Sequence, residues 1–591
     1  MTSPRGTRAA GQPGGKDGSA GPHAGADPAD PAETVTAEAM HAGAGPADAS
    51  SADTGAADAQ GAGGLQGDAA RTAGATTVQV PASTPDRAEQ RRLAHRPGSR
   101  AEAIWALWLP PAVAFIVSLW GITAPSFWRD EAATIAAVKR PLGDLIRMLG
   151  NVDAVHGAYY LMMWPIEHVL GSGALVLRLP SAIAVAVGAL AVAATGRRLI
   201  SPWAGMSAGL IYAVLPVVSM YGQEVRSYAM VMAVAAISSY LLVRILDAEP
   251  ARQRRWIIWY GVSIAALGVL NIFGLVLVPA HGVTIALCGR GRFKDPEFRR
   301  LAIGWIAAIA AGVVIASPLL VLGWMQRGQI AWLSVNTSSS GLGTLFSLCG
   351  SYLVTTAVLA VIAVAVVLGS ETSRQKRRAN WPRRLAEVSL PWLIVPPVVL
   401  LAASTVQPVY TSRYILICVP AVALITGAAV ASYGRIAGAI ALLVVLIAGA
   451  PTQAGQRTVD GHYDDIVALD NIVSANAKPG DYVLYTNPNS ESFGAAYPSG
   501  LGKLPDIAQK QGPIASGTLA GTNVPLAQLR SRLSHAKRVW VVEINHFQPD
   551  PQMLGLNGLP LSVTPVMAGS SLQLTNYWHE RADYLILFTR P

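Results

Sequence analysis

Continuous apolar runs of about 18 or more residues, the length of a transmembrane helix, recur along this chain and constrain its fold most strongly. The runs are unbroken rather than alternating, which favours helices over a β-barrel. Charged residues make up only 14% of the chain, against roughly 25% in soluble domains. We therefore predict a polytopic α-helical membrane protein.

The positions of the cationic residues predict how the spans are oriented. With about eleven spans, every dense Lys/Arg cluster lies on one side, which the positive-inside rule makes the cytosol. The N-terminus is then cytosolic and the C-terminal region extracytoplasmic. The predicted spans cover about 103–122, 174–195, 203–221, 227–246, 256–288 (two spans in a hairpin), 301–323, 345–369, 388–404, 414–432 and 436–450.

The segment AYYLMMWPIEHVLG at 158–171 is apolar, but it is too short for a span of about 20 residues. It also contains Pro165, Glu167 and His168. We predict a juxtamembrane helix that lies in the interface. The alternative, a short true span, would invert the orientation of everything that follows it.

The membrane domain is predicted at 101–450, with 123–173 as its first extracytoplasmic loop. Residues 1–100 are rich in Ala, Gly, Asp and Pro, which predicts a disordered cytosolic tail. Residues 451–591 alternate between helical and strand patterns, which predicts a small α/β domain. Its expected helices are Tyr463–Ala475 and Val524–Ala536, and its expected strands are Tyr482–Tyr485, Arg538–Ile544 and Tyr584–Thr589.

Polar and ionisable side chains gather in three connections that the predicted topology brings to one face. Such residues close to the hydrocarbon are functional candidates by default. The first loop, the turn after the third span and the turn after the ninth span contribute Arg129, Asp130, Glu131, Asp153, His156, Gln223, Glu224, Arg226, Tyr228, Tyr410 and Arg413. Both signs of charge therefore converge on the predicted outer surface.

This combination suits glycosyl transfer from a lipid phosphate. Arginine neutralises a phosphate leaving group by paired hydrogen bonds, and Arg226 and Arg413 are the candidates for that task. A carboxylate can act as general base on an acceptor hydroxyl. Asp130 is the predicted base, and Glu131 is predicted to support it or to orient the acceptor. A single inverting displacement requires only one such base.

Other readings of these residues are open. Asp130 and Glu131 could only cap the following helix, the arginines could anchor at the interface, and the tyrosines could form an aromatic belt. The same outer charges would also serve a transporter of lipid-linked glycans, or a scaffold that displays the outer domain.

Several classes of function are disfavoured. The sequence has no G-x-x-x-x-G-K-[ST] or H-E-x-x-H motif and no Cys/His cluster typical of zinc sites. The net charge of +10 resides largely in the loops and indicates no nucleic-acid partner. The cofactor candidate is a divalent cation held by Asp130 and Glu131, with water and phosphate completing its shell.

An ordered set of motifs resembles a known superfamily. The set comprises Trp128-Arg129-Asp130-Glu131-Ala132, Asp153-Ala154-Val155-His156-Gly157-Ala158-Tyr159-Tyr160, Leu177-Arg178-Leu179-Pro180-Ser181, Tyr221-Gly222-Gln223-Glu224-Val225-Arg226-Ser227-Tyr228 and Pro408-Val409-Tyr410-Thr411-Ser412-Arg413-Tyr414. Over about 125–450 the chain resembles the GT-C membrane glycosyltransferases, in particular the protein O-mannosyltransferase-like (family 39-type) group of actinobacteria.

The resemblance implies a polyprenyl-phosphate sugar donor, an inverting mechanism and catalysis outside the cytosol at the plasma membrane. The expected sugar is mannose or a related one, and the acceptor is a cell-envelope glycan, a lipid or a protein. The acidic residue of the family's first loop matches Asp130, and its arginine after the third span matches Arg226. The family's His-Pro-Pro pattern is only partly present, because Gly157 and Ala158 follow His156. Residues 451–591 lie outside the shared core.

Overall fold

The computed structural model describes residues 100–328, 341–372, 381–462, 464–544, 566–567, 569–580 and 583–591. The predicted disordered tail therefore lies outside the described residues, apart from Arg100, which begins the first helix. Parts of the loop at 326–343 and of the basic connection at 373–384 also lie outside them.

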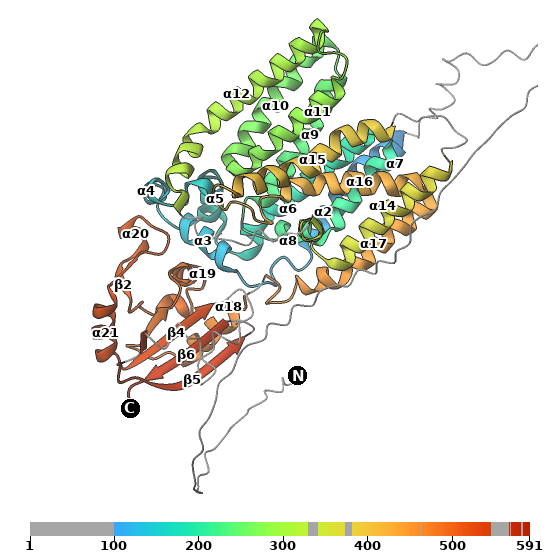
Figure 1. Cartoon of the computed structure of the whole chain (residues 1–591). Helices are drawn as coiled ribbons and strands as arrows, with labels where there is room; N and C mark the ends of the chain where they lie inside the picture. Colours follow the sequence, from blue (N-terminus) through green and yellow to red (C-terminus); the bar gives the residue numbers. More distant parts are fainter. Residues whose placement is uncertain are drawn as a thin grey trace, which may run out of the picture. The chain divides into compact units, whose positions relative to one another are not determined.

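Each apolar segment predicted from the sequence is helical (Figure 1). The helices are α2 (Arg100–Leu119), α6 (Ala174–Leu199), α7 (Pro202–Val214), α8 (Pro216–Gly222), α9 (Tyr228–Asp247), α10 (Pro250–Leu270), α11 (Leu277–Cys288), α12 (Pro296–Met325), α13 (Gly341–Cys349), α14 (Tyr352–Thr372), α15 (Trp381–Ser404), α16 (Val419–Ser432) and α17 (Arg435–Gly455). The 3-10 turns η2 (Ile272–Val276) and η4 (Leu416–Cys418) precede α11 and α16. The predicted helical membrane fold is confirmed.

Five described helices are long and apolar enough to cross a membrane, namely α6, α9, α12, α15 and α17. Two bent pairs, α7 with α8 and α13 with α14, raise that number to seven if each pair is one span. The first bend of 63° follows from Pro216, which forces Leu215 into an extended conformation between the two helices. Eleven spans remain a prediction.

Four short elements fill the first long connection. They are α3 (Arg129–Val138), α4 (Leu142–Asn151), the 3-10 turn η1 (Ala154–His156) and α5 (Gly157–Leu170). Their apolar faces meet in one core that includes Ile135, Met148 and Tyr160. The predicted juxtamembrane helix is thus helical, with an N-terminus close to that expected.

The C-terminal region is an α/β domain, as predicted. Its sheet has the strand order β1-β4-β6-β5, with β1 parallel to β4 and the other pairs antiparallel. The strands are β1 (Tyr482–Tyr485), β4 (Arg538–Ile544), β5 (Gln573–Glu580) and β6 (Asp583–Thr589), and a second small sheet pairs β2 (Gln509–Gln511) with β3 (Thr522–Asn523). The helices are α18 (Ile466–Asn476), α19 (Phe493–Ala496), α20 (Pro513–Ser516) and α21 (Leu526–His535), with 3-10 turns η5 (Pro488–Ser492) and η6 (Leu501–Lys503).

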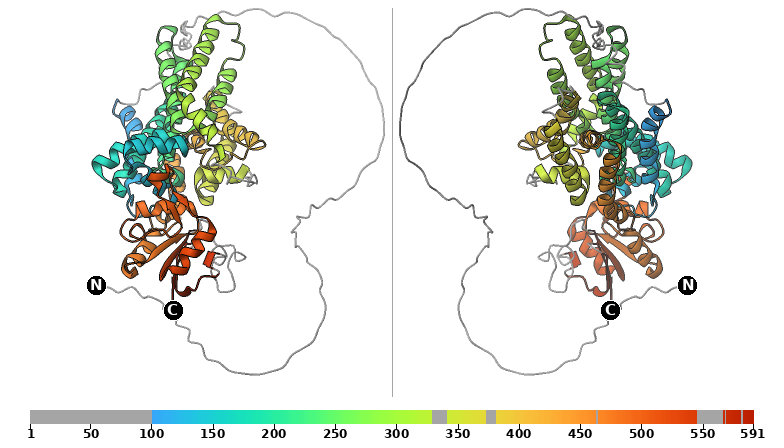
Figure 2. Two further views of the ribbon diagram at one scale, coloured as in Figure 1. Left: turned by 90° about the vertical axis from the view of Figure 1, so that its left-hand side faces the viewer. Right: turned by 90° about the vertical axis from the view of Figure 1, so that its right-hand side faces the viewer.

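The main sheet is buried on both faces because successive side chains of a strand point in opposite directions. In β4, Val539 and Val541 pack in one core with Leu533 of α21. Trp540 and Val542 pack in the opposite core, which contains Leu469 of α18. Figure 2 shows this sheet with its flanking helices. The two-sided core explains why β1 and β4 are continuous apolar runs.

A buried ion pair organises the junction between α3 and α6. Arg178 donates to both oxygens of Glu131, at 2.9 and 2.7 Å, and both side chains are fully buried. The remaining donors of Arg178 bond the carbonyls of Ile122, Pro125 and Ser126. The pair therefore fixes the loop that leads into α3.

The same carboxylate holds the turn between α8 and α9. The backbone N–H of Val225 donates to Glu131 at 2.9 Å, and the Thr134 hydroxyl donates to the Val225 carbonyl at 3.0 Å. From α6, Ser181 donates to the Glu224 carbonyl at 2.6 Å. These three hydrogen bonds fix the backbone of the turn and therefore the position of the next residue, Arg226.

Removing Arg178 leaves Glu131 buried without its counter-ion. We expect Arg178→Ala to lower the free energy of unfolding by about 3–5 kcal/mol, measured as a lower thermal midpoint of the purified protein. The matched control is Arg198→Ala, also on α6, whose partner Asp247 is about a third exposed. Its cost should stay within about 1 kcal/mol. Equal losses in the two variants would contradict the role assigned to the buried pair.

Acid should weaken the same pair. Burial alone would raise the pKa of Glu131, but Arg178 outweighs burial and lowers the pKa from 4.5 to about 2. A depressed pKa contributes stability above pH 4.5, and this contribution disappears as the pH falls towards 2. We expect the thermal midpoint of the wild type to fall over this window. Glu131→Gln should be less stable at neutral pH and less sensitive to acid, and identical acid profiles would refute the assignment.

Candidate active site

Asp130 lies between two arginines from distant parts of the chain. Arg413, from the turn between α15 and α16, donates to Asp130 Oδ2. Arg226, after α8, lies with its Nη2 3.4 Å from Asp130 Oδ1. The Arg413 guanidinium also stacks over the Trp128 ring, 4.8 Å from its centroid. Three of the predicted site residues thus meet.

The site is partly open. The Asp130 and Arg413 side chains are 20% and 28% exposed, whereas Arg226 is 8% exposed. Burial alone would raise the pKa of Asp130, but the two arginines outweigh burial and lower it to about 2. Asp130 is therefore ionised at neutral pH. Two cations face one carboxylate, which leaves a net positive charge at an accessible surface.

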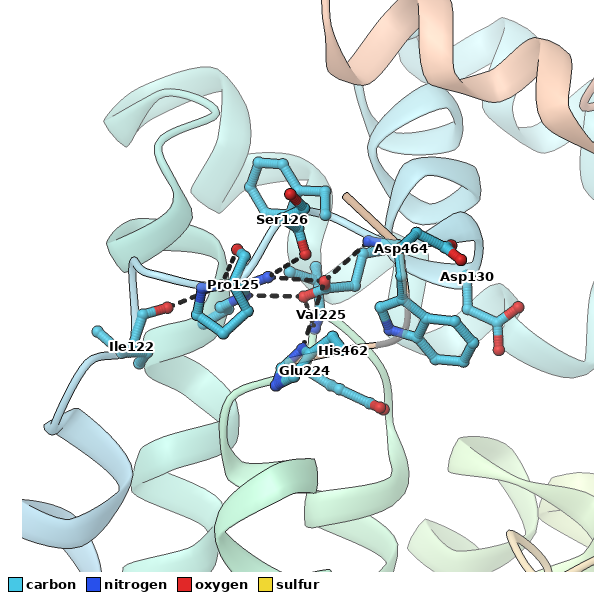
Figure 3. A network of polar contacts seen from close by, with 12 residues as sticks. Ile122, Pro125, Ser126, Asp130, Glu224, Val225, His462 and Asp464 are labelled. Carbon is cyan, nitrogen blue, oxygen red and sulfur yellow. Dashed lines mark hydrogen bonds and ion pairs between the residues drawn. The ribbon is translucent and has the colours of Figure 1, made fainter. Parts of the chain in front are cut away.

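Glu131 does not share this environment, although it is the next residue. Its oxygens accept from Arg178 and from the N–H groups of Val225 and Trp128. The last contact is a helix cap, one of the alternatives that the sequence left open. Figure 3 shows Asp130 pointing away from this network. The geometry favours a positioning role for Glu131 over the predicted catalytic one.

Asp153, His156 and Tyr160 form a second polar group beside Arg226. The Tyr160 hydroxyl donates to Asp153 Oδ2 at 2.5 Å and accepts from Arg226 at 3.1 Å. His156 Nε2 lies 3.9 Å from Asp153 Oδ1. Asp153 adopts a left-handed conformation with φ of 61°, which aspartate tolerates better than most residues. Burial lowers the pKa of His156 to about 4, so its ring is neutral at pH 7.

Glu224 and Gln223 differ in their surroundings. The Gln223 amide donates to the carbonyls of Ser118 and Trp120, which ties the turn to the end of α2. Both carboxylate oxygens of Glu224 are buried without a hydrogen-bond partner among the described residues. Burial raises the pKa of Glu224 well above its usual range.

The two predicted tyrosines, Tyr228 and Tyr410, contact other uncharged side chains. Tyr228 is buried and packs edge to face on Tyr221, with centroids 5.3 Å apart. The Tyr410 hydroxyl pairs with Thr344 at 2.8 Å. Arg129 turns to the segment after α17, where its backbone N–H donates to Asp464 at 3.4 Å.

That segment supplies two residues that the sequence analysis did not select. Asp464 is buried, and burial raises its pKa to about 7 against the charge of Arg129. His462 is also buried, with Nδ1 3.9 Å from Glu131. Asp464 and Asp130 face the same region in Figure 3. Local sequence contained no signal for either residue, because they follow the last apolar helix in an irregular stretch.

The arrangement suits an anion better than a cation. The oxygens of Glu131 are occupied by Arg178 and backbone donors, so Asp130 and Glu131 do not present a shared pair of carboxylates. The described residues include no group of three or more His, Cys, Asp or Glu side chains placed to hold a metal. A phosphate, in contrast, would find two arginines at the edge of an open site.

Comparisons with known proteins agree with this architecture. Residues 157–324 match the family of dolichyl-phosphate-mannose-protein mannosyltransferases. ArnT from Cupriavidus metallidurans in the apo state is similar in structure, with a TM-score of 0.54 and 12% identity over 82% of this chain and 98% of ArnT. The same protein bound to undecaprenyl phosphate gives 0.53 and 12% over 81% and 97%. A search of curated protein sequences found no match.

These similarities extend from the membrane helices into the C-terminal domain, since they cover more than four fifths of the chain. At 12% identity the likeness concerns the fold. The chain has the fold of the GT-C membrane glycosyltransferases, and its residues from α5 to α12 match the mannosyltransferase family of that superfamily.

Proposed function

We propose that the protein is an inverting glycosyltransferase that moves a sugar, mannose or a related one, from a polyprenyl-phosphate donor to an extracytoplasmic acceptor. The observation that carries this proposal is Asp130 held between Arg226 and Arg413 at a partly open surface. The ArnT structure with bound undecaprenyl phosphate supports a lipid phosphate as the donor carrier. The acceptor would be a glycan, lipid or protein of the cell envelope.

In this proposal the donor phosphate competes with Asp130 for the arginines. A sugar phosphodiester carries one negative charge, which matches the net charge that two arginines and one carboxylate leave. Arginine bonds to the phosphate oxygens stabilise the charge that develops as the bond from the anomeric carbon to the phosphate breaks. The polyprenyl chain would lie along the apolar helices.

Release from the arginines makes Asp130 a better base. Its pKa is low because both arginines face it, and a phosphate that draws them away removes that effect. Asp130 then accepts the proton of the acceptor hydroxyl while the acceptor oxygen bonds the anomeric carbon from the opposite side. The products are the inverted glycoside and the polyprenyl phosphate. Glu131 takes no part in the proton transfer. It holds α3, and therefore Asp130, in position.

The test is sugar transfer by the purified protein from radiolabelled polyprenyl-phosphate mannose, arabinose and glucose. We expect Asp130→Asn to reduce turnover by about 10²–10⁴-fold while it still binds the lipid, because both arginines remain. Asp144→Asn, on the partly exposed face of α4, is the control and should transfer normally. Equal transfer by Asp130→Asn would remove Asp130 as the base. No transfer by the wild type from any donor would favour a transporter of lipid-linked glycans.

The arginines should affect donor binding rather than the acceptor. Hydrogen bonds to charged groups contribute about 1.5–3 kcal/mol, so we expect Arg413→Gln to weaken binding of polyprenyl phosphate about 10–100-fold. Arg327→Gln, at an exposed arginine just after α12, is the control. Titration of each variant with polyprenyl phosphate in nanodiscs gives the dissociation constants. Unchanged affinity in Arg413→Gln would show that the phosphate binds elsewhere.

A further inference from the structure

A cleft of about 390 Å³ lies between the last turn of α3 and the C-terminal domain. One wall is formed by Ala136 of α3 and by Lys139 and Arg140, which follow the helix, and segments around β1, α19 and β2 form the rest. Its volume is within the range of roughly 300–1,000 Å³ that small-molecule sites occupy. The described lining contains none of the residues assigned to the candidate active site, so this is a separate cleft.

Three polar groups that line the cleft have no hydrogen-bond partner among the described residues. They are Tyr485 Oη, Glu491 Oε2 and Asp506 Oδ2. Tyr485 is only 6% exposed. Buried polar groups are almost always paired, so three unpaired ones around a single cavity indicate groups that a ligand completes.

Hydrogen bonds within the protein orient the two carboxylates, Glu491 and Asp506, towards a ligand. Glu491 accepts from the Asn523 amide through Oε1 at 3.0 Å, and Asp506 accepts from the Ala508 N–H through Oδ1 at 2.8 Å. In each case one oxygen orients the group and the other remains unused. Such prior fixation lowers the entropy that a ligand must overcome to form its hydrogen bonds.

Glycines keep the cleft open beside the tyrosine. Gly494 and Gly502 both line it. A Cβ atom at Gly494 would lie 3.6 Å from the Tyr485 hydroxyl oxygen and 3.6 Å from the Gly502 Cα, which is ordinary contact. A side chain would therefore be tolerated at position 494, and a branched one would extend into the empty space.

The lining favours a neutral ligand rich in hydroxyl groups. The unpaired carboxylates disfavour an anion. The two cations that follow α3 already bond backbone carbonyls, Lys139 to Ala495 at 2.8 Å and Arg140 to Thr518 at 2.6 Å. Their charge disfavours a cationic ligand. Hydroxyl groups both donate and accept, which suits all three unpaired groups. The apolar side chains of Leu501, Leu504 and Leu519 would contact the carbon face of a sugar ring.

We propose that this cleft binds the acceptor of the transfer reaction and that the acceptor is a neutral saccharide. The proposal rests on the glycosyltransferase function proposed above. Helix α3 connects the two sites, because Asp130 lies in its first turn and Ala136, near its C-terminal end, lines the cleft. Six residues of helix separate them by about 9 Å along the axis. A saccharide anchored in the cleft would present a further hydroxyl towards Asp130.

The test measures binding without any donor. Neutral trisaccharides of mannose, arabinose and glucose are titrated by calorimetry into the full-length protein in nanodiscs. We expect the wild type to bind at least one of them and Gly494→Val to weaken that binding at least tenfold. Tyr485→Phe and Glu491→Gln should each weaken it severalfold. Gly150→Val, at an exposed glycine of α4 with nothing within 4 Å of its Cβ, is the control and should bind normally.

Failure of this proposal differs from failure of the glycosyltransferase function. Binding of no trisaccharide, equal binding by Gly494→Val, or binding of spermidine alone that Glu491→Gln abolishes would each overturn the saccharide cleft. If the wild type transfers sugar and Gly494→Val has an unchanged acceptor KM, the saccharide cleft is again overturned. The glycosyltransferase function would still stand. The opposite outcome is that the wild type binds a saccharide but transfers no sugar, and that Gly494→Val abolishes the binding. This outcome would support the saccharide-binding cleft and reject the glycosyltransferase function.

Discussion

The site around Asp130 depends on the buried ion pair between Glu131 and Arg178. A charge removed from water is costly unless it is paired and fully hydrogen-bonded, and here both conditions hold. Every donor of Arg178 reaches Glu131 or a carbonyl of the loop before α3. If that loop moved, the buried guanidinium of Arg178 would lose its hydrogen bonds to the loop carbonyls. The start of α3, the turn after α8 and the N-terminal part of α6 consequently form one rigid unit.

The adjacent acids Asp130 and Glu131 have different roles in this unit. Successive helical residues point about 100° apart, so one carboxylate can face the interior while its neighbour faces the surface. Glu131 has backbone and arginine partners on the inside. Asp130 faces Arg226 and Arg413, which come from separate turns and are brought together only by the helix bundle. The buried Glu131 thereby fixes the direction in which the accessible Asp130 points.

Unbroken apolar runs were enough to predict the membrane helices, since each run long enough to span a bilayer is helical. Strands β1 and β4 begin and end at the predicted residues. Strand β5 was not predicted, because its sequence QLTNYWHE alternates weakly and it lies at the edge of the sheet. The convergence of Asp130, Arg226 and Arg413 followed from topology alone. The separation of Glu131 from Asp130 did not, because the partner Arg178 lies on another helix. Asp464 could not be predicted, because only tertiary structure brings an irregular linker to Arg129.

The linker also has a consequence for biosynthesis. Arg178 follows Glu131 by 47 residues, so a ribosome adding about 5–20 residues per second supplies the ion pair within roughly 2–9 s. Asp464 follows Arg129 by 335 residues, a delay of roughly 20–70 s at the same rate. The ion pair that supports the site can thus form early in synthesis, whereas the Asp464 contact requires the segment after α17. The contact between Arg129 and Asp464 therefore cannot form during that interval.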